Sequence, residues 1–211
     1  MQNNAPMTRR FGVWMAWSAA LASSAYAAAQ ILQLLAVLSD PWDRILIFAP
    51  SLALAPAFVL AVAALHARTP PSRRLWSLGA LALAILYAAD VSLVYVVQLC
   101  AVIQNDLDGS GASVALFACC NFHMPATSID LLGYTYMSFS TLLLAAALPA
   151  GVTTRALRWA LIANGTLAPV ILGQLLWPVL IYMASPWLVT FPASMLLLAR
   201  ELATPAQPWA N

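Results

Sequence analysis

Long apolar stretches separated by short polar connections dominate the chain. A helix that crosses the roughly 30 Å hydrocarbon layer of a bilayer needs about 20 consecutive apolar residues. Six stretches meet this requirement, and they predict transmembrane helices near residues 11–38, 45–66, 75–103, 130–150, 156–175 and 178–199. The pattern therefore predicts an all-α fold, a polytopic transmembrane bundle of six helices in which residues 1–211 form a single domain.

The composition supports a membrane protein. Hydrophobic residues make up 63% of the 211 residues and charged residues only 8%, whereas about 25% of the residues in a soluble domain are charged. So few charges could not cover the surface of a soluble globule of this size. A soluble globule, a disordered chain and a disulfide-dense secreted scaffold are therefore excluded.

Arginine accounts for all 9 basic residues and predicts the orientation of the helices. Cytoplasmic connections accumulate Lys and Arg, and with the N-terminus inside, every arginine except Arg44 falls on the cytoplasmic side. Both termini are then predicted to be cytoplasmic. The lysine-free, Ala- and Leu-rich composition indicates the inner (plasma) membrane of a bacterium. Because the arginines are dispersed, the net charge of +2 does not predict a nucleic-acid-binding surface.

The N-terminal segment also resembles a signal peptide. Arg9 and Arg10 precede a short apolar run and the small-residue stretch 22–29, a pattern typical of such peptides. However, the apolar character continues through Leu38 instead of stopping at a cleavage site. We therefore favour an uncleaved first helix; cleavage would leave five helices without changing the orientation of the others.

Two carboxylates in the predicted spans are candidate acid–base residues. Asp90 lies midway along the third span, where a carboxylate costs about 2.5–3.5 kcal/mol to insert. Intramembrane carboxylates commonly mark an ion pathway, a proton relay or a ligand site. Asp130, at the start of the fourth span, is its candidate partner. Capping of that helix is the structural alternative for Asp130.

Other polar side chains share a depth with these carboxylates. On the third span Tyr87, Asp90, Tyr95 and Gln98 fall within about 140° of one another. In the predicted orientation the polar residues of five helices lie in the outer half of the membrane, with Asp90 as the floor. They predict a polar cavity open to the outer leaflet, with candidate ligand-binding residues Tyr26, Gln30, Gln33, Tyr87, Tyr95, Gln98, Tyr134, Gln174 and Tyr182. Hydrogen bonds between helices and interfacial anchoring of Tyr134 and Tyr182 are the structural alternatives.

The longest connection, residues 104–129, is predicted on the outer side. Its second half includes the apolar run 114–120, which is too short to span the membrane. We expect it to fold over the cavity as a lid or to lie in the membrane interface. A disulfide from Cys100 to Cys119 or Cys120 would fasten it; otherwise the adjacent cysteines are free or redox-active.

The sequence contains no motif of a soluble enzyme. It lacks H-E-x-x-H, G-x-S-x-G, C-x-x-C and a glycine-rich phosphate loop. Residues 106–109 begin like a calcium-binding loop but lack the glutamate at position twelve. The sequence therefore predicts neither a metal nor a cofactor.

Three short motifs resemble those of a known group of proteins. They are Tyr95-x-x-Gln98, Asp130-Leu-Leu-Gly133-Tyr134-x-x-Met137-Ser138, and Arg158-Trp159 with Asn164-Gly165. From about residue 45 the chain is similar to a loose group of uncharacterised bacterial six-helix membrane proteins classed as a domain of unknown function. The resemblance implies an all-α membrane fold and no particular activity. The Cys119-Cys120 loop is not a feature of that group.

Three functions fit these features. The first is binding of a hydrophobic or lipid-like small molecule whose head is oriented by Tyr, Gln and Asp side chains. The second is a membrane-embedded enzyme, such as a cyclase, an isomerase or a lipid-modifying enzyme, with Asp90 as acid or base. The third is a proton-coupled transporter with Asp90 as the relay. Membrane lipids and a hydrophobic small molecule are the expected partners, and the oligomeric state is left open.

Overall fold

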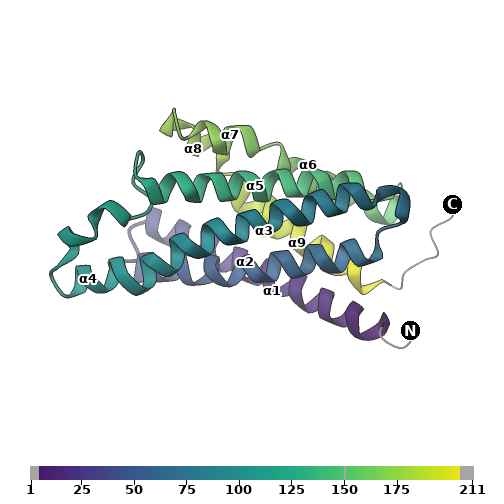
Figure 1. Ribbon diagram of the computed structural model, residues 1–211, viewed down its shortest axis with the longest axis horizontal. Coiled ribbons are helices and arrows are strands. Elements are labelled where there is room, and N and C mark those ends of the chain that lie inside the picture. Colours follow the sequence, from purple (N-terminus) through teal and green to yellow (C-terminus); the bar gives the residue numbers. More distant parts are fainter. Residues whose placement is uncertain (1–4, 150, 205–211) are drawn as a thin grey trace.

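The computed structural model describes residues 5–149 and 151–204, and within these ranges every regular element is a helix. The long helices lie side by side as an elongated bundle (Figure 1). The all-α prediction is therefore confirmed. The α-helices are α1 (Ala5–Leu34), α2 (Trp42–Arg68), α3 (Arg74–Val97), α4 (Ile103–Leu107), α5 (Pro125–Ala147), α6 (Val152–Gly165), α7 (Ala168–Gly173), α8 (Ile181–Ala184) and α9 (Trp187–Ala203).

Four helical segments are long and apolar enough to cross a membrane. They are Trp42–Arg68, Pro71–Leu107, Pro125–Ala147 and Thr154–Gly173. Pro178–Ala184 and Trp187–Ala203 qualify only together, as a pair bent by 40°, so the described residues contain four or five such spans. Helix α1 has 30 residues but is not among them, because its Ser, Trp, Tyr and Gln residues lower its mean hydropathy. The fold is that of a membrane protein with several transmembrane helices.

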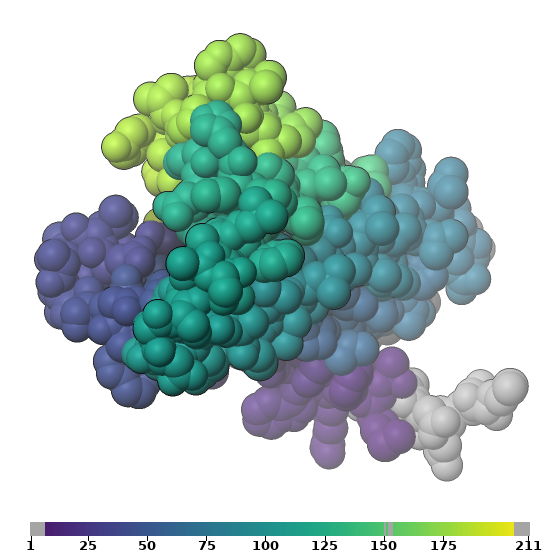
Figure 2. Space-filling model, turned by 60° about the vertical axis from the view of Figure 1, so that its left-hand side comes forward, coloured from purple at the N-terminus to yellow at the C-terminus, as the bar shows by residue number. Residues whose placement is uncertain are grey.

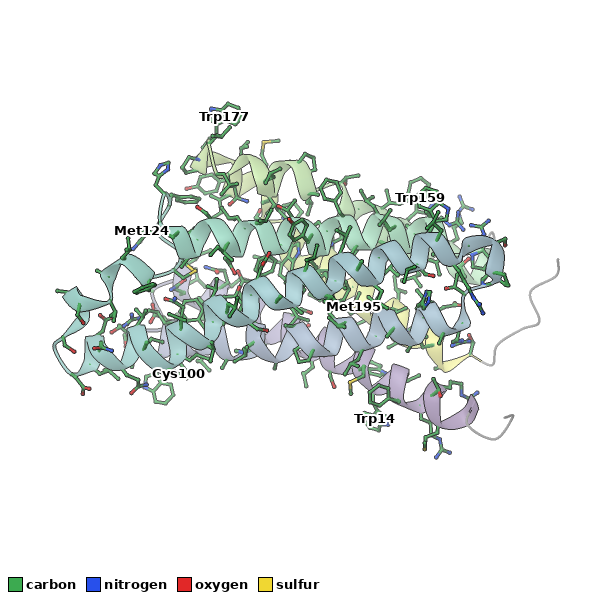
Figure 3. All side chains as sticks on the ribbon, in the orientation of Figure 1. Trp14, Cys100, Met124, Trp159, Trp177 and Met195 are labelled. Carbon is green, nitrogen blue, oxygen red and sulfur yellow. The ribbon has the colours of Figure 1, made fainter. Side chains whose placement is uncertain are left out.

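The outside of the bundle is strongly apolar. Trp14, Trp159 and Trp177 project away from the helices (Figure 3) and are at least 60% exposed. Leu86 and Leu93 are also exposed on the side of α3. Soluble monomers rarely show so much contiguous apolar surface. These side chains are suited to contact with lipid chains.

Helix α1 ends earlier than the hydropathy pattern predicts. The predicted span was 11–38, whereas the observed helix is Ala5–Leu34. Ala36 has a left-handed φ of 55°, and the amides of Ala36 and Val37 donate to the carbonyls of Gln33 and Leu32 (both 2.9 Å). This is the Schellman arrangement that ends helices. Backbone hydrogen bonding, and not a change in polarity, therefore stops α1.

The connection predicted on the outer side of the membrane, here called the outer connection after that prediction, is shorter than predicted. Helix α3 continues through the π-helical segment Gln98–Val102 into α4, which ends at Leu107. Helix α5 begins at Pro125, five residues before the predicted start at 130, because proline is favoured in the first helical turn. The connection is therefore residues 108–124 and not 104–129.

The last two predicted helices are both interrupted. The predicted span 156–175 is divided between α6 and α7 at residues 166–167. The predicted span 178–199 is divided between α8 and α9 at Ser185 and Pro186. Proline lacks an amide donor and disfavours a helical conformation in the residue before it. Pro169 and Pro186 lie at or beside these two breaks.

Arginine side chains bind the ends of helices at one end of the bundle, here called the arginine end. Arg68 donates to the carbonyl of Leu202 (2.8 Å) at the end of α9. Arg73 and Arg158 donate to the carbonyl of Leu148 (2.7 and 2.6 Å), just after α5. The last carbonyls of a helix have no partner within it. The arginines therefore join neighbouring helices by satisfying these groups.

Substitution Arg68→Gln should destabilise this end. We expect it to lower the free energy of unfolding by about 1.5–3 kcal/mol, because it removes charge-assisted hydrogen bonds from the end of α9. Arg200→Gln is the matched control, since Arg200 is exposed near the same end and should change stability by less than about 0.5 kcal/mol. Unfolding of the detergent-solubilised protein in SDS measures both. Equal losses for the two variants would contradict the capping role.

Candidate functional site

An aromatic cluster fills the interior of the bundle near the end opposite the arginine end. The ring of Trp187 lies edge-to-face against Tyr134 and Tyr26, with centroid distances of 5.0 and 5.7 Å. Tyr87 packs edge-to-face on Tyr134 at 5.7 Å. The rings therefore touch one another directly. We define the aromatic cluster as Tyr26 of α1, Tyr87 and Tyr95 of α3, Tyr134 of α5 and Trp187 of α9.

Phenylalanines extend this packing along α2 and α9. Phe191 stacks on Trp187 at 5.1 Å, and Phe58 lies edge-to-face between Phe191 and Tyr87 at 5.4 and 5.9 Å. Phe58, Phe191 and Tyr87 are fully buried. Aromatic pairs contribute about 0.5–1.5 kcal/mol each beyond the area they bury. These contacts hold the cluster rigidly in place.

Asp130 is the acidic residue of the cluster. It lies one turn before Tyr134 on α5, and its carboxylate interacts with the Tyr95 side chain. A hydrogen bond of 3.0 Å joins the Tyr95 and Tyr134 hydroxyls. Since α5 begins at Pro125, Asp130 does not cap the helix, and that alternative is wrong. The structure places the half-buried Asp130 beside tyrosines, with its Oδ1 atom covered.

Three buried polar atoms around the cluster have no hydrogen-bond partner among the described residues. They are the Tyr87 hydroxyl, the Trp187 indole nitrogen and Oδ1 of Asp130. An unpaired buried donor or acceptor costs about 1–3 kcal/mol. Buried polar groups in native proteins are normally satisfied by protein or ordered water. Three unpaired atoms together therefore mark a place suited to a polar group from outside the chain.

The polar residues of α1 are already paired with one another. Tyr26 donates to Gln30 (3.3 Å), Gln30 to Gln33 (3.1 Å) and Gln33 to Asp43 (3.0 Å). This chain of hydrogen bonds runs from the aromatic cluster to the start of α2. Gln30 and Gln33 therefore link α1 to α2. This agrees with the alternative interpretation that polar residues join helices by hydrogen bonds and do not bind a ligand.

The outer connection folds onto this end of the bundle. The Gln98 amide donates to the Phe117 carbonyl and accepts from the Cys119 amide (both 2.8 Å). The Cys120 amide donates to the Thr127 hydroxyl (2.9 Å). Figure 2 shows this connection, in teal, between the purple-blue α1–α2 turn and the yellow-green α7–α8 region. Gln98 thus holds the connection in place from α3.

Substitution Gln98→Ala should loosen the connection. Two of its side-chain hydrogen bonds go to residues 117–119, and their loss frees this segment to open and exchange its backbone amides. We expect hydrogen–deuterium exchange of residues 115–124 to be about tenfold faster, since local opening governs exchange. Gln104→Ala is the control, because Gln104 is exposed and bonds only locally to Leu99. Unchanged exchange in Gln98→Ala would show that other contacts hold the connection.

Asp90 lies outside the aromatic cluster. It sits where α3 meets α5, and a Cβ added at Gly133 would lie 3.2 Å from its own Cβ. Its side chain is half-buried, with Oδ2 unpaired. Asp90 and Asp130 show no interaction with each other among the described residues. Asp90 thus packs beside Gly133, one turn after Asp130 on α5, and the partnership of the two carboxylates stays a prediction.

The remaining candidates also lie apart from the cluster. Gln174 is buried at the end of α7, whereas Tyr182 on α8 is 78% exposed. Sequence analysis missed Trp187 and Phe58, because in a membrane-spanning stretch apolar side chains look alike whether they face lipid or protein. The position of Trp187 directly after the break at Pro186 could have predicted its burial. Irregular backbone within a membrane is tolerated where protein surrounds it.

The cluster is closed as the structure shows it. The aromatic rings fill the space between the helices themselves. A small cavity of about 10 Å³ lies at the arginine end between Arg68, Leu148 and Glu201, with room for about one water molecule. Among the described residues, no group of three His, Cys, Asp or Glu side chains could hold a metal ion.

No protein-family model matches the chain. No curated protein and no solved structure matches it either. The site is therefore interpreted from its own chemistry.

Proposed function

We propose that the protein binds a hydrophobic or lipid-like small molecule at the aromatic cluster, with Asp130 at the centre of the site. Three unpaired polar atoms, on the neighbouring residues Tyr87, Asp130 and Trp187, carry this proposal. Two of them are donors, on Tyr87 and Trp187, and the third is a carboxylate acceptor. Binding sites for small molecules combine a mostly apolar and aromatic lining with a few such polar groups. The matching ligand has a polar head that both donates and accepts hydrogen bonds, and an apolar body.

We also propose that the chain spans a bacterial inner membrane six times with both termini in the cytoplasm. Helix α1 lies against α2 and α9 and so belongs to the same bundle. Helices α8 and α9 would form one bent span. Every arginine except Arg44 falls on the same side of the predicted spans as Arg68 and Arg73 of the arginine end, and cytoplasmic ends are rich in arginine. The aromatic cluster then belongs to the outer half of the membrane.

Ligand access in this proposal requires movement of the outer connection. Gln98 and Thr127 hold residues 117–120 through three hydrogen bonds. A net hydrogen bond contributes only about 0.5–1.5 kcal/mol. The connection can therefore open without unfolding the helices, and its opening would expose the cluster to the outer leaflet.

A membrane-embedded enzyme, such as a cyclase, an isomerase or a lipid-modifying enzyme, is the second candidate. A buried carboxylate beside several tyrosines is also suited to acid–base chemistry. Asp130, and not Asp90, would then be the acid or base. A proton-coupled transporter with Asp90 as relay has less support, because Asp90 shares no interaction with Asp130 or the cluster among the described residues.

Native mass spectrometry of the purified protein tests the proposal. We expect one amphipathic molecule of defined mass to remain bound per chain, and lipid extraction should identify it. A mixture of phospholipids in the proportions of the surrounding membrane would contradict a specific site. Conversion of the bound molecule to a product would establish the enzyme instead. Uptake into proteoliposomes that depends on a pH gradient would establish the transporter.

A further inference from the structure

Two adjacent cysteines meet in the outer connection. The sulfur atoms of Cys119 and Cys120 are 2.7 Å apart, and both thiols are free. Neighbouring side chains on an extended strand point to opposite sides. Cys120 has a left-handed φ of 75°, a conformation disfavoured for residues with a Cβ. This turn brings the two sulfur atoms together on one side of the chain.

Side chains of two helices hold this pair in place. The Cys119 amide donates to Gln98 on the π-helical continuation of α3, at 2.8 Å. The Cys120 amide donates to Thr127 in the first turn of α5, at 2.9 Å. Thr127 also donates to the Asn121 carbonyl at 2.7 Å. The left-handed backbone at Cys120 is therefore held in place by these hydrogen bonds to α3 and α5.

The two thiols differ in their surroundings. Cys120 is exposed, whereas Cys119 is partly covered and packs against the hydrophobic core. The hydrogen bond with Cys120, followed by burial, raises the pKa of the Cys119 thiol. The thiolate is the nucleophilic form of cysteine. Cys120 is thus placed to react first with a molecule from outside, and Cys119 to react second.

We propose that Cys119 and Cys120 form a redox-active vicinal pair that converts between the dithiol and a Cys119–Cys120 disulfide by exchange with an incoming disulfide. The Cys120 thiolate attacks the incoming disulfide, forms a mixed disulfide and releases one thiol. The Cys119 sulfur then attacks the Cys120 sulfur and releases the second thiol. Two electrons and the two cysteine protons pass to the incoming disulfide, which leaves as two thiols. The reverse reaction regenerates the dithiol.

The position of the pair connects its redox state to the aromatic cluster. The thiol groups lie near Tyr26, and Cys119 lies near Asp130. A disulfide between Cys119 and Cys120 would close a small ring that includes the peptide bond between them. The amides of these two residues donate the hydrogen bonds that hold the connection to Gln98 and Thr127. Oxidation would therefore change how the connection covers the site. The exchange reaction itself does not depend on the proposed ligand.

Peptide mass spectrometry of the full chain tests the proposal directly. The purified, reduced protein is incubated with oxidised glutathione, alkylated and cleaved with chymotrypsin. Cleavage after Phe117 and Phe122 gives a peptide that contains Cys119 and Cys120 but not Cys100. We expect this peptide to lose the mass of two hydrogen atoms and to regain it with dithiothreitol. Alkylation of both cysteines at saturating oxidised glutathione, or a bond to Cys100, would overturn the proposal.

Single variants test the order of the two steps. Cys119→Ser should stop at a stable glutathione adduct on Cys120, because the second attacking sulfur is missing. Cys120→Ser should form an adduct on Cys119 about tenfold more slowly, since the Cys119 thiol is less accessible than that of Cys120. Cys100→Ala is the control and should oxidise like the unchanged protein, because Cys100 lies exposed on the outside of the bundle (Figure 3). Equal adduct formation on both single variants would contradict the assigned order.

Discussion

Substitution Asp130→Asn is expected to weaken binding of the co-purifying molecule by about 10- to 100-fold. A hydrogen bond to a charged group contributes about 1.5–3 kcal/mol, and the neutral amide oxygen of asparagine is a weaker acceptor for the ligand head than the carboxylate. Asparagine has nearly the same shape, so the ring packing around Tyr134 should persist. Titration of the delipidated protein with the molecule identified by mass spectrometry measures the affinity. The melting temperature of each variant checks that it is folded.

Asp90→Asn is the matched control for this experiment. Asp90 is also an intramembrane carboxylate with an unpaired oxygen, but it lies outside the aromatic cluster. We expect its affinity for the ligand to remain within about twofold of the unchanged protein, because the unpaired Oδ2 of Asp90 makes no hydrogen bond with the cluster. A larger loss in Asp90→Asn than in Asp130→Asn, with both variants folded, would move the site to the contact of α3 with α5.

Substitution Phe58→Ala is expected to lower the free energy of unfolding by about 3–5 kcal/mol. Phe58 is fully buried and contacts both Tyr87 and Phe191. Its removal leaves a cavity between α2, α3 and α9, so the packing contacts that drive helix association in a membrane are lost. Denaturation in SDS, followed by circular dichroism, measures the change.

Phe139→Ala is the control, because it removes the same type of side chain from a position outside the buried packing. Phe139 lies on α5 and is 40% exposed, so lipid or detergent chains can fill the space that its ring leaves. We expect a loss of less than about 1 kcal/mol. Similar losses in Phe58→Ala and Phe139→Ala would mean that the aromatic contacts at Phe58 do not stabilise the bundle.

Hydropathy predicts the helical class and most of the long helices, because the length of an apolar stretch is a local property. It does not predict where helices stop when backbone geometry decides. Helix α1 ends at Leu34 because Ala36 turns left-handed, although the apolar run continues to Leu38. In contrast, the start of α5 could have been predicted from Pro125, because proline is common in the first turn of a helix. The prediction from the length of the apolar stretch did not consider it.

The candidate site was predicted only in part. The sequence does not decide whether a residue at the edge of a helix–helix contact faces the bundle interior or the lipid. Tyr87 and Asp90 are about 60° apart on α3, yet Tyr87 is fully buried and Asp90 half-buried. Which of them faces the interior depends on the rotation of α3 against α5. The residues predicted from the sequence include Tyr26, Tyr87, Tyr95 and Tyr134 of the cluster and Asp130 beside them, whereas Asp90 shows no contact with the cluster rings.

Photo-crosslinking in lipid vesicles tests the central claim most directly. The probe is an amphipathic molecule that carries a diazirine beside its polar head, added from the outer side of the vesicle. We predict that it labels the peptides that contain Tyr134 and Trp187, and that Asp130→Asn reduces this labelling about tenfold. Labelling confined to lipid-facing residues such as Trp14 and Leu86, and unchanged in Asp130→Asn, would contradict a binding site inside the bundle.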